Sequence, residues 1–113
     1  MSQNEKPPLR GDIFLVKLNP TQGNEIQDER PCVIISPNEI NLESDTLIIA
    51  PMTTGSYPYI FRIPYESEGK KGHIIIDQIR TIDKKNRLGK YLGQIDNKTL
   101  EKCLSILQEM FAL

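Results

Sequence analysis

The absences in this sequence are informative, and the first is the lack of a long apolar run. No run approaches the roughly 20 residues that a helix needs to span a bilayer, and residues 1–8 are polar, unlike a signal peptide or an anchor. We therefore expect a protein of the cytoplasm. The two cysteines, Cys32 and Cys103, are too few for a disulfide scaffold and lack the CxxC spacing of a zinc site, so we predict buried free thiols.

The common catalytic motifs are also missing. The single histidine, His73, excludes a metal site of several imidazoles, and its place before three isoleucines favours an inert residue at the start of a strand. Neither GxxxxGK[ST] nor GxGxxG occurs, which argues against nucleotide-driven chemistry. No GxSxG elbow and no Cys–His pairing indicates acyl transfer. The sequence therefore predicts no cofactor and no bound metal.

The charge balance leaves the question of a nucleic-acid partner open. The formal net charge is −1, whereas tight phosphate binding usually requires a strongly basic face. Basic residues gather only locally, at Arg80, Lys84, Lys85, Arg87 and Lys90. This cluster can hold phosphates without reading sequence, or it can form an ordinary solvated face.

The remaining pattern predicts one small β-rich domain. The 113 residues suit a single core, with residues 1–9 as a flexible leader and 10–113 as the domain. Short apolar runs broken by Pro, Gly and Asn predict strands near 13–18, 31–36, 47–50, 59–63, 74–76 and 79–82, a helical turn at 37–41, and loops at 19–30, 51–56 and 66–72. Strands without intervening helices exclude a βαβ sheet and favour a small barrel.

The C-terminal segment has a helical pattern instead. Asp96 can cap a helix, and apolar residues then recur at steps of three and four, at Leu100, Cys103, Leu104, Leu107, Met110 and Phe111. This stripe predicts a helix packed on the barrel, and the apolar residues at its end suit a subunit contact.

Polar residues at the limits of the predicted strands are the candidates for a site. Arg30 precedes a proline and is therefore held in an extended conformation at the mouth of a strand; its alternative is a salt bridge with Asp28 or Glu29. Thr53 and Thr54 can hold a phosphate or satisfy turn backbone groups. Asp77 follows an apolar run, where it can instead bond to backbone amides.

Four segments resemble the MazF/PemK (Kid) family of toxin endoribonucleases. They appear in the family's order from about residue 10 to the C-terminal helix. The segments are Arg10-Gly11-Asp12-Ile13-Phe14-Leu15-Val16, then Asn19-Pro20-Thr21-Gln22-Gly23-Asn24-Glu25 with Arg30-Pro31, then Pro51-Met52-Thr53-Thr54, and Asp77-Gln78-Ile79-Arg80-Thr81-Ile82-Asp83 with Lys85, Arg87 and Gly89-Lys90. The resemblance implies a mainly β fold with α, a small SH3-like (CcdB/PemK-like) barrel with a C-terminal helix.

The resemblance also implies a function. Members are homodimers that cleave single-stranded RNA (mRNA) at short sequences and are inhibited by a cognate antitoxin. The family's main catalytic pair matches Arg30 and Thr53, and Kid-like members add the aspartate that matches Asp77. Those members carry an arginine where this chain has Ile75 and a histidine where it has Asn24, so the Arg30/Thr53 version fits better.

RNA supplies its own nucleophile, the 2′-OH, so cleavage needs no metal-bound water. Glu25 is the first candidate for the general base and Asp77 the second. Residues expected to contact RNA are Thr21, Gly23, Asn24, Thr54, Tyr57, Gln78, Arg80, Lys84 and Arg87. The alternatives are a toxin of the same shape that binds a protein such as DNA gyrase, and a family member that has lost activity.

Overall fold

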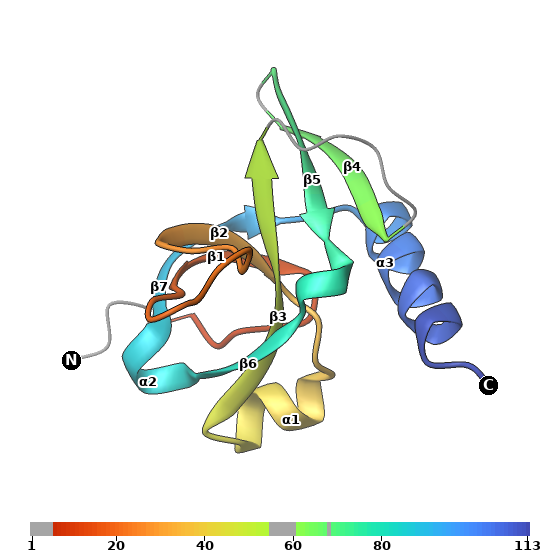
Figure 1. Ribbon diagram of the computed structural model, residues 1–113. Coiled ribbons are helices and arrows are strands. Elements are labelled where there is room, and N and C mark those ends of the chain that lie inside the picture. The colour runs from red at the N-terminus through yellow and green to blue at the C-terminus, as the bar shows by residue number, and fades with distance from the viewer. Residues whose placement is uncertain (1–5, 55–60, 68) are drawn as a thin grey trace.

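The structure is a computed structural model that describes residues 6–54, 61–67 and 69–113. These ranges contain seven strands, three helices and a 3-10 turn (Figure 1). In chain order the elements are β1 (Asp12–Lys17), β2 (Glu29–Ile34), α1 (Asn38–Glu43), β3 (Thr46–Thr54), β4 (Arg62–Ser67), β5 (Lys70–Ile75), η1 (Ile76–Gln78), β6 (Arg80–Asp83), α2 (Lys84–Arg87), β7 (Leu88–Gln94) and α3 (Asn97–Met110). The predicted mainly β fold with a C-terminal helix is confirmed.

The strands form one antiparallel sheet in the order β4-β5-β3-β2-β1-β7, and β6 pairs with β3 beside this path. The long strand β3 changes partner along its length. Ile49 lies opposite Ile34 of β2 and Arg80 of β6, whereas Thr53 lies opposite His73 of β5. The sheet curls around β3 but is not closed within the described residues, so the predicted barrel is present as a barrel-like, open fold (Figure 1).

The sheet separates two apolar clusters, and successive residues of a strand point to different ones. Ile13 and Val33 belong to the cluster under α3, while Phe14 and Ile34 belong to the cluster next to β6 and β7. This is the two-residue period of a strand. Both faces of β1 and β2 are therefore covered, which explains why the run 31–36 has almost no polar interruption.

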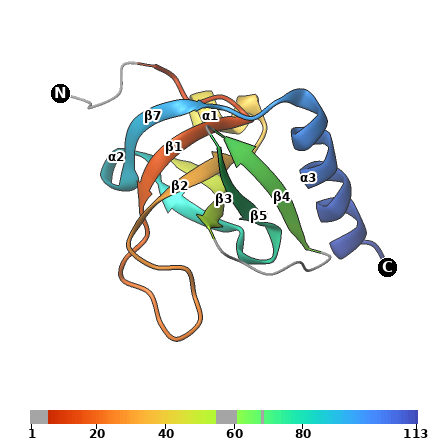
Figure 2. The same cartoon turned by 90° about the horizontal axis from the view of Figure 1, so that it is seen from above.

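Helix α3 begins where the sequence predicts. The Asp96 carboxylate accepts a hydrogen bond from the backbone N–H of Thr99, with 2.7 Å between oxygen and nitrogen, and so caps the first turn. The helix lies alongside β4 in both views (Figures 1 and 2). Its apolar stripe packs on the first cluster through Leu100, Cys103, Leu104, Ile106, Leu107 and Met110.

The expectation that prolines limit the strands is wrong at Pro51 and Pro64. β3 continues through Pro51 to Thr54, where the sequence predicts a loop. Pro51 lies opposite Cys32 of β2, and the next residue, Met52, already pairs with β5, so the missing N–H falls where the strand changes partner. Pro64 lies in β4 at the edge of the sheet, where a missing donor is tolerated.

Other limits also differ from the prediction. β5 begins at Lys70, so the connection after β4 is shorter than the predicted loop 66–72, and residues 76–78 form η1 instead of ending a strand. α2 and β7 have no counterpart in the prediction. β7 contains Gly89 and Gly93 at inward positions and the exposed Leu92 at an outward one, so its sequence lacks the alternation of apolar and polar residues that predicts a strand.

Both cysteines are free and buried, as predicted. Burial raises the pKa of the Cys32 thiol to about 12, against a smaller lowering by Arg80 and Arg30, and burial raises the pKa of Cys103 to about 11. Such thiols stay protonated at neutral pH and are poor nucleophiles.

No helix of the described ranges has the length and apolarity to cross a membrane.

Candidate active site

A long connection between β1 and β2, residues 18–28, projects from the body of the protein and is called the β1–β2 loop here (Figure 2). Its two ends are joined by a hydrogen bond from the Leu18 N–H to the Asp28 carbonyl (3.0 Å). Within it, Glu25 forms a small turn, because its carboxylate accepts from the Gln22 N–H (2.8 Å) and its own N–H donates to the Gln22 carbonyl (3.1 Å). The loop is thus an ordered turn of chain.

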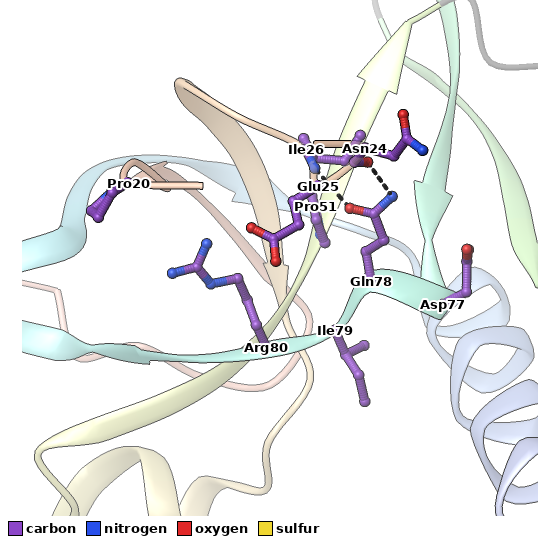
Figure 3. A pocket seen from close by; sticks show the side chains of 9 residues that line it. All are labelled: Pro20, Asn24, Glu25, Ile26, Pro51, Asp77, Gln78, Ile79 and Arg80. Carbon is purple, nitrogen blue, oxygen red and sulfur yellow. Dashed lines mark hydrogen bonds between the residues drawn. The ribbon is translucent and has the colours of Figure 1, made fainter. Parts of the chain in front are cut away.

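Gln78 of η1 holds this loop over the sheet. Its side-chain oxygen accepts from the Ile26 N–H at 2.7 Å, and its side-chain nitrogen donates to the Asn24 carbonyl at 3.3 Å (Figure 3). Both polar ends of the side chain therefore bind loop backbone. Gln78 is predicted to contact RNA, and in this structure it binds the backbone on both sides of the predicted base Glu25, at the predicted RNA contact Asn24 and at Ile26.

A cavity of about 620 Å³ opens beside Gln78 and is called the Gln78 cavity here. Side chains of Glu25 and Arg80 reach into it from opposite sides (Figure 3). At its margin Asp77 forms an ion pair with Arg62 of β4 (Nε to Oδ1 3.4 Å). Its full lining is Pro20, Asn24, Glu25, Ile26, Pro51, Asp77, Gln78, Ile79 and Arg80.

Three basic residues predicted to contact RNA bind backbone carbonyl groups. Arg80 donates to Leu18 (2.9 Å), Arg87 donates to Lys17 and Asn19 (2.9 and 2.7 Å), and Lys84 donates to Asn41 (2.6 Å). The two arginines thereby hold the start of the β1–β2 loop. A guanidinium has five N–H donors, so these bonds leave donors for a phosphate.

A second cavity, of about 540 Å³, contains the predicted catalytic pair and is called the Thr53 cavity here. Arg30, near the start of β2, and Thr53, near the end of β3, both line it. The complete lining is Ile13, Arg30, Pro31, Met52, Thr53, Thr54, Tyr65, Lys70, Lys71, Gly72, His73 and Leu92. The lining therefore combines cationic and polar side chains with apolar ones.

Arg30 is oriented by one backbone group. Its Nε donates to the Gln27 carbonyl at 3.1 Å. Asp28 and Glu29 both lie in the part of the chain that the structure describes, and neither forms a salt bridge with Arg30. The alternative role of this arginine, a salt bridge with one of them, is therefore not observed. The guanidinium therefore keeps its Nη groups for a ligand in the cavity. Thr53 donates its hydroxyl to the Thr54 carbonyl at 3.2 Å, an exposed bond that a ligand can replace.

A close approach of β5 to β3 shapes this cavity. Gly72 faces the backbone of Thr53, and a Cβ at position 72 would collide with the Thr53 carbonyl oxygen. Glycine at this position therefore lets the β4–β5 hairpin lie directly against the strand that carries Thr53. The hairpin brings Lys70 and Lys71 to the same cavity.

The predicted site residues are divided between the two cavities. Arg30, Thr53 and Thr54 line the Thr53 cavity, while Asn24, Glu25, Asp77, Gln78 and Arg80 line the Gln78 cavity. Neither candidate for the general base, Glu25 or Asp77, shares the cavity of Arg30. Thr21 and Gly23 lie in the β1–β2 loop, and Tyr57 lies outside the described residues.

Sequence reasoning misses the polar residues of β5 that line the Thr53 cavity. His73, interpreted as inert, lies directly opposite Thr53. Lys70 and Lys71 are not among the residues predicted for the site. No sequence signal gives the pairing of β5 with β3, which is what brings these side chains to Thr53. Across the described ranges, no group of three or more His, Cys, Asp or Glu side chains has a metal-binding arrangement.

The fold of this chain occurs in solved structures of other proteins. The fold matches that of MazF from Deinococcus radiodurans (TM-score 0.83, 20% identity, covering 96% of this chain and 100% of that one). It also matches a mycobacterial endoribonuclease solved in complex with its cognate antitoxin (TM-score 0.75, 24% identity, covering 90% and 92%). Both likenesses establish the fold of a MazF-type toxin.

The sequence comparison is more specific. Residues 9–111 match the family described as PemK-like, MazF-like toxin of type II toxin-antitoxin system. The Escherichia coli endoribonuclease PemK is 34% identical over 103 residues, which cover 87% of this chain and 77% of that protein. The chain therefore belongs to the PemK-like, MazF-like toxin family.

Proposed function

We propose that this protein is a sequence-specific, metal-independent endoribonuclease, an mRNA interferase that cuts single-stranded RNA. The observation that carries the proposal is the shared position of Arg30 and Thr53 in one open cavity. A guanidinium and a hydroxyl can both donate hydrogen bonds to the oxygens of a pentavalent phosphorane. The relative PemK is named an endoribonuclease, which supports the same activity for this chain.

The proposed reaction is attack of the ribose 2′-oxygen on the adjacent phosphorus. The O2′–P bond forms while the P–O5′ bond breaks, the 2′-OH gives its proton to a base, and the 5′-oxygen receives a proton. The products are a 2′,3′-cyclic phosphate and a 5′-hydroxyl. DNA lacks the 2′-OH and is not cut.

Arg30 stabilises the phosphorane, because its planar fork can bind two phosphate oxygens and its charge is permanent. That permanence also makes it unsuitable as a base. Thr53 donates its hydroxyl to a non-bridging oxygen. Glu25 and Asp77 stay candidates for the base, and both lie at the Gln78 cavity. The 2′-OH is next to the phosphate that Arg30 and Thr53 bind, so this role requires one of the two carboxylates to come within hydrogen-bond distance of that ribose.

The proposed partners follow from the same family. A cognate antitoxin inhibits the protein, in line with the related endoribonuclease that was solved with its antitoxin. The proposed active form is a homodimer in the cytoplasm. Phe111, which is 72% exposed just beyond α3, provides an apolar surface for a subunit contact.

The test is cleavage of a long single-stranded RNA by purified protein in EDTA, with a DNA copy of the same sequence alongside. We expect 5′-hydroxyl RNA fragments, intact DNA, and a rate for Arg30→Ala that is lower by about 10²–10³, as for loss of one oxyanion donor.

Lys102→Ala is the matched control, because it removes one positive charge from an exposed position on α3. Unchanged cleavage by a folded Arg30→Ala protein would contradict the mechanism. Absence of cleavage by the folded, antitoxin-free wild type would contradict the activity and direct attention to gyrase binding.

A further inference from the structure

One buried polar atom of the Thr53 cavity lacks a partner. Among the described residues, the Nδ1 atom of His73 is the buried side-chain nitrogen or oxygen without a hydrogen bond. Buried polar groups are nearly always bonded, and an unbonded one costs about 1–3 kcal/mol. Such an exception often marks a functional site. The proposed reaction gives His73 no role.

The position of His73 relates it directly to the catalytic pair. β5 lies between β3 and β4, and His73 is opposite Thr53 on one side and Pro64 on the other. Directly opposed residues of antiparallel strands carry their side chains on the same face of the sheet. The imidazole is therefore the neighbour of the Thr53 hydroxyl, and both side chains line the cavity that contains Arg30.

The unpartnered Nδ1 also indicates which ring nitrogen carries the proton of the neutral imidazole. A proton on Nδ1 would be a buried donor without an acceptor, and unsatisfied buried N–H groups are rarer than unsatisfied acceptors. The tautomer with the proton on Nε2 avoids this cost. Within the described part of the chain, Nε2 has no protein acceptor and is not a buried atom, so it is available as a donor in the cavity.

We propose that His73 is a third donor to the scissile phosphate, beside Arg30 and Thr53. This role rests on the proposed ribonuclease function and adds a residue to it. The Nε2–H donates a hydrogen bond to a non-bridging phosphoryl oxygen whose negative charge grows as the O2′–P bond forms. His73 neither gains nor loses a proton; the 2′ proton goes to the separate base, and the neutral ring is unchanged after the P–O5′ bond breaks.

Two amide variants separate this role from a structural one. The side-chain nitrogen of His73→Gln can occupy the place of Nε2, whereas that of His73→Asn reaches only the place of Nδ1. We expect His73→Ala and His73→Asn to lower kcat by about 10²–10³, as for loss of an oxyanion donor. We expect His73→Gln to recover to within about tenfold of wild type on the same basis, with all three variants folded by circular dichroism.

A sulfur substitution in the substrate gives a readout that packing does not affect. Sulfur is a weak acceptor, so replacing the non-bridging oxygen that binds Nε2 slows the wild type for one phosphorothioate diastereomer. His73→Ala has already lost that bond, so its rate should fall much less with the same diastereomer. Equal sulfur effects in wild type and His73→Ala, or equal activity of His73→Gln and His73→Asn, would overturn the proposal.

The outcome for the wild type distinguishes the two proposals. Cleavage that depends on Arg30 but not on His73 contradicts the role of His73 alone. A wild type that cleaves no RNA contradicts the ribonuclease function and this role with it.

Discussion

The anchor of the β1–β2 loop gives the most direct quantitative prediction. Gln78→Ala removes the acceptor of the Ile26 N–H and the donor to the Asn24 carbonyl without touching the loop itself. Each hydrogen bond contributes about 0.5–1.5 kcal/mol net. Together they stabilise the closed loop by about 1–3 kcal/mol, which corresponds to a change in the opening equilibrium of roughly 5- to 150-fold.

Amide hydrogen exchange measures this opening at single residues. We expect the Ile26 amide of Gln78→Ala to exchange roughly 5- to 150-fold faster than in wild type. The bond between Leu18 and Asp28 reports whether the base of the loop also opens. Because the loop carries Glu25, the value of kcat/KM for RNA should fall as well, since substrate must then order the loop.

Gln27→Ala is the matched control. It makes the same substitution in the same loop, and its side chain makes no hydrogen bond within the described residues; the backbone carbonyl that binds Arg30 is retained. An Ile26 amide whose exchange changes less than about twofold in Gln78→Ala would refute the reasoning, because even one bond at the low end of its range predicts more.

Two further predictions concern stability. Gly72→Ala places a Cβ against the Thr53 carbonyl, so we expect the free energy of unfolding to fall by about 1–3 kcal/mol, as for other overpacked sites. Calorimetry should show a lower Tm. A Tm equal to that of Lys71→Ala would contradict the close approach. The hydrogen bonds from Thr99 lower the pKa of Asp96 below its usual 3.8. The charged Asp96 cap therefore stabilises the folded protein fully above pH 3.8, and this contribution is lost as the pH falls through the lowered pKa. Asp96→Ala should therefore have a lower Tm than Asp96→Asn at pH 7. The difference in Tm between wild type and Asp96→Ala should become smaller at acidic pH, and a difference that does not depend on pH would argue against the cap.

The parts of the fold that depend on local pattern are predictable from the sequence. The apolar runs locate β1, β2 and the first half of β3, and Asp96 with the following stripe locates α3. The pattern fails where pairing overrides it. Pro51 ends a strand by every local rule, yet β3 continues because its partner changes at that residue.

The candidate site is less predictable, because pairing between distant strands creates it. Arg30 and Thr53 are candidates from their places at the limits of strands, their catalytic roles come from the family resemblance, and the structure places both in one cavity. Glu25 and Asp77 match the same family but line the other cavity. The neighbourhood of His73 depends on which strand β5 joins, and a histidine at the start of an isoleucine run carries no information about that.

The burial of both strand faces has a consequence for how the chain finds its register. In a half-exposed sheet, a slip of one residue is rejected because it exposes apolar side chains. In β1 and β2, a slip would exchange one apolar cluster for another, so polarity rejects it only weakly. The bonds from Arg87 to Lys17, from Arg80 to Leu18 and from Gln78 to Ile26 join residues 70, 62 and 52 positions apart in the chain. Each bond forms only when β6 and its flanking turns are aligned in one way with the β1–β2 loop. A sheet that is paired in another register loses these bonds, so the polar residues disfavour mispaired sheets.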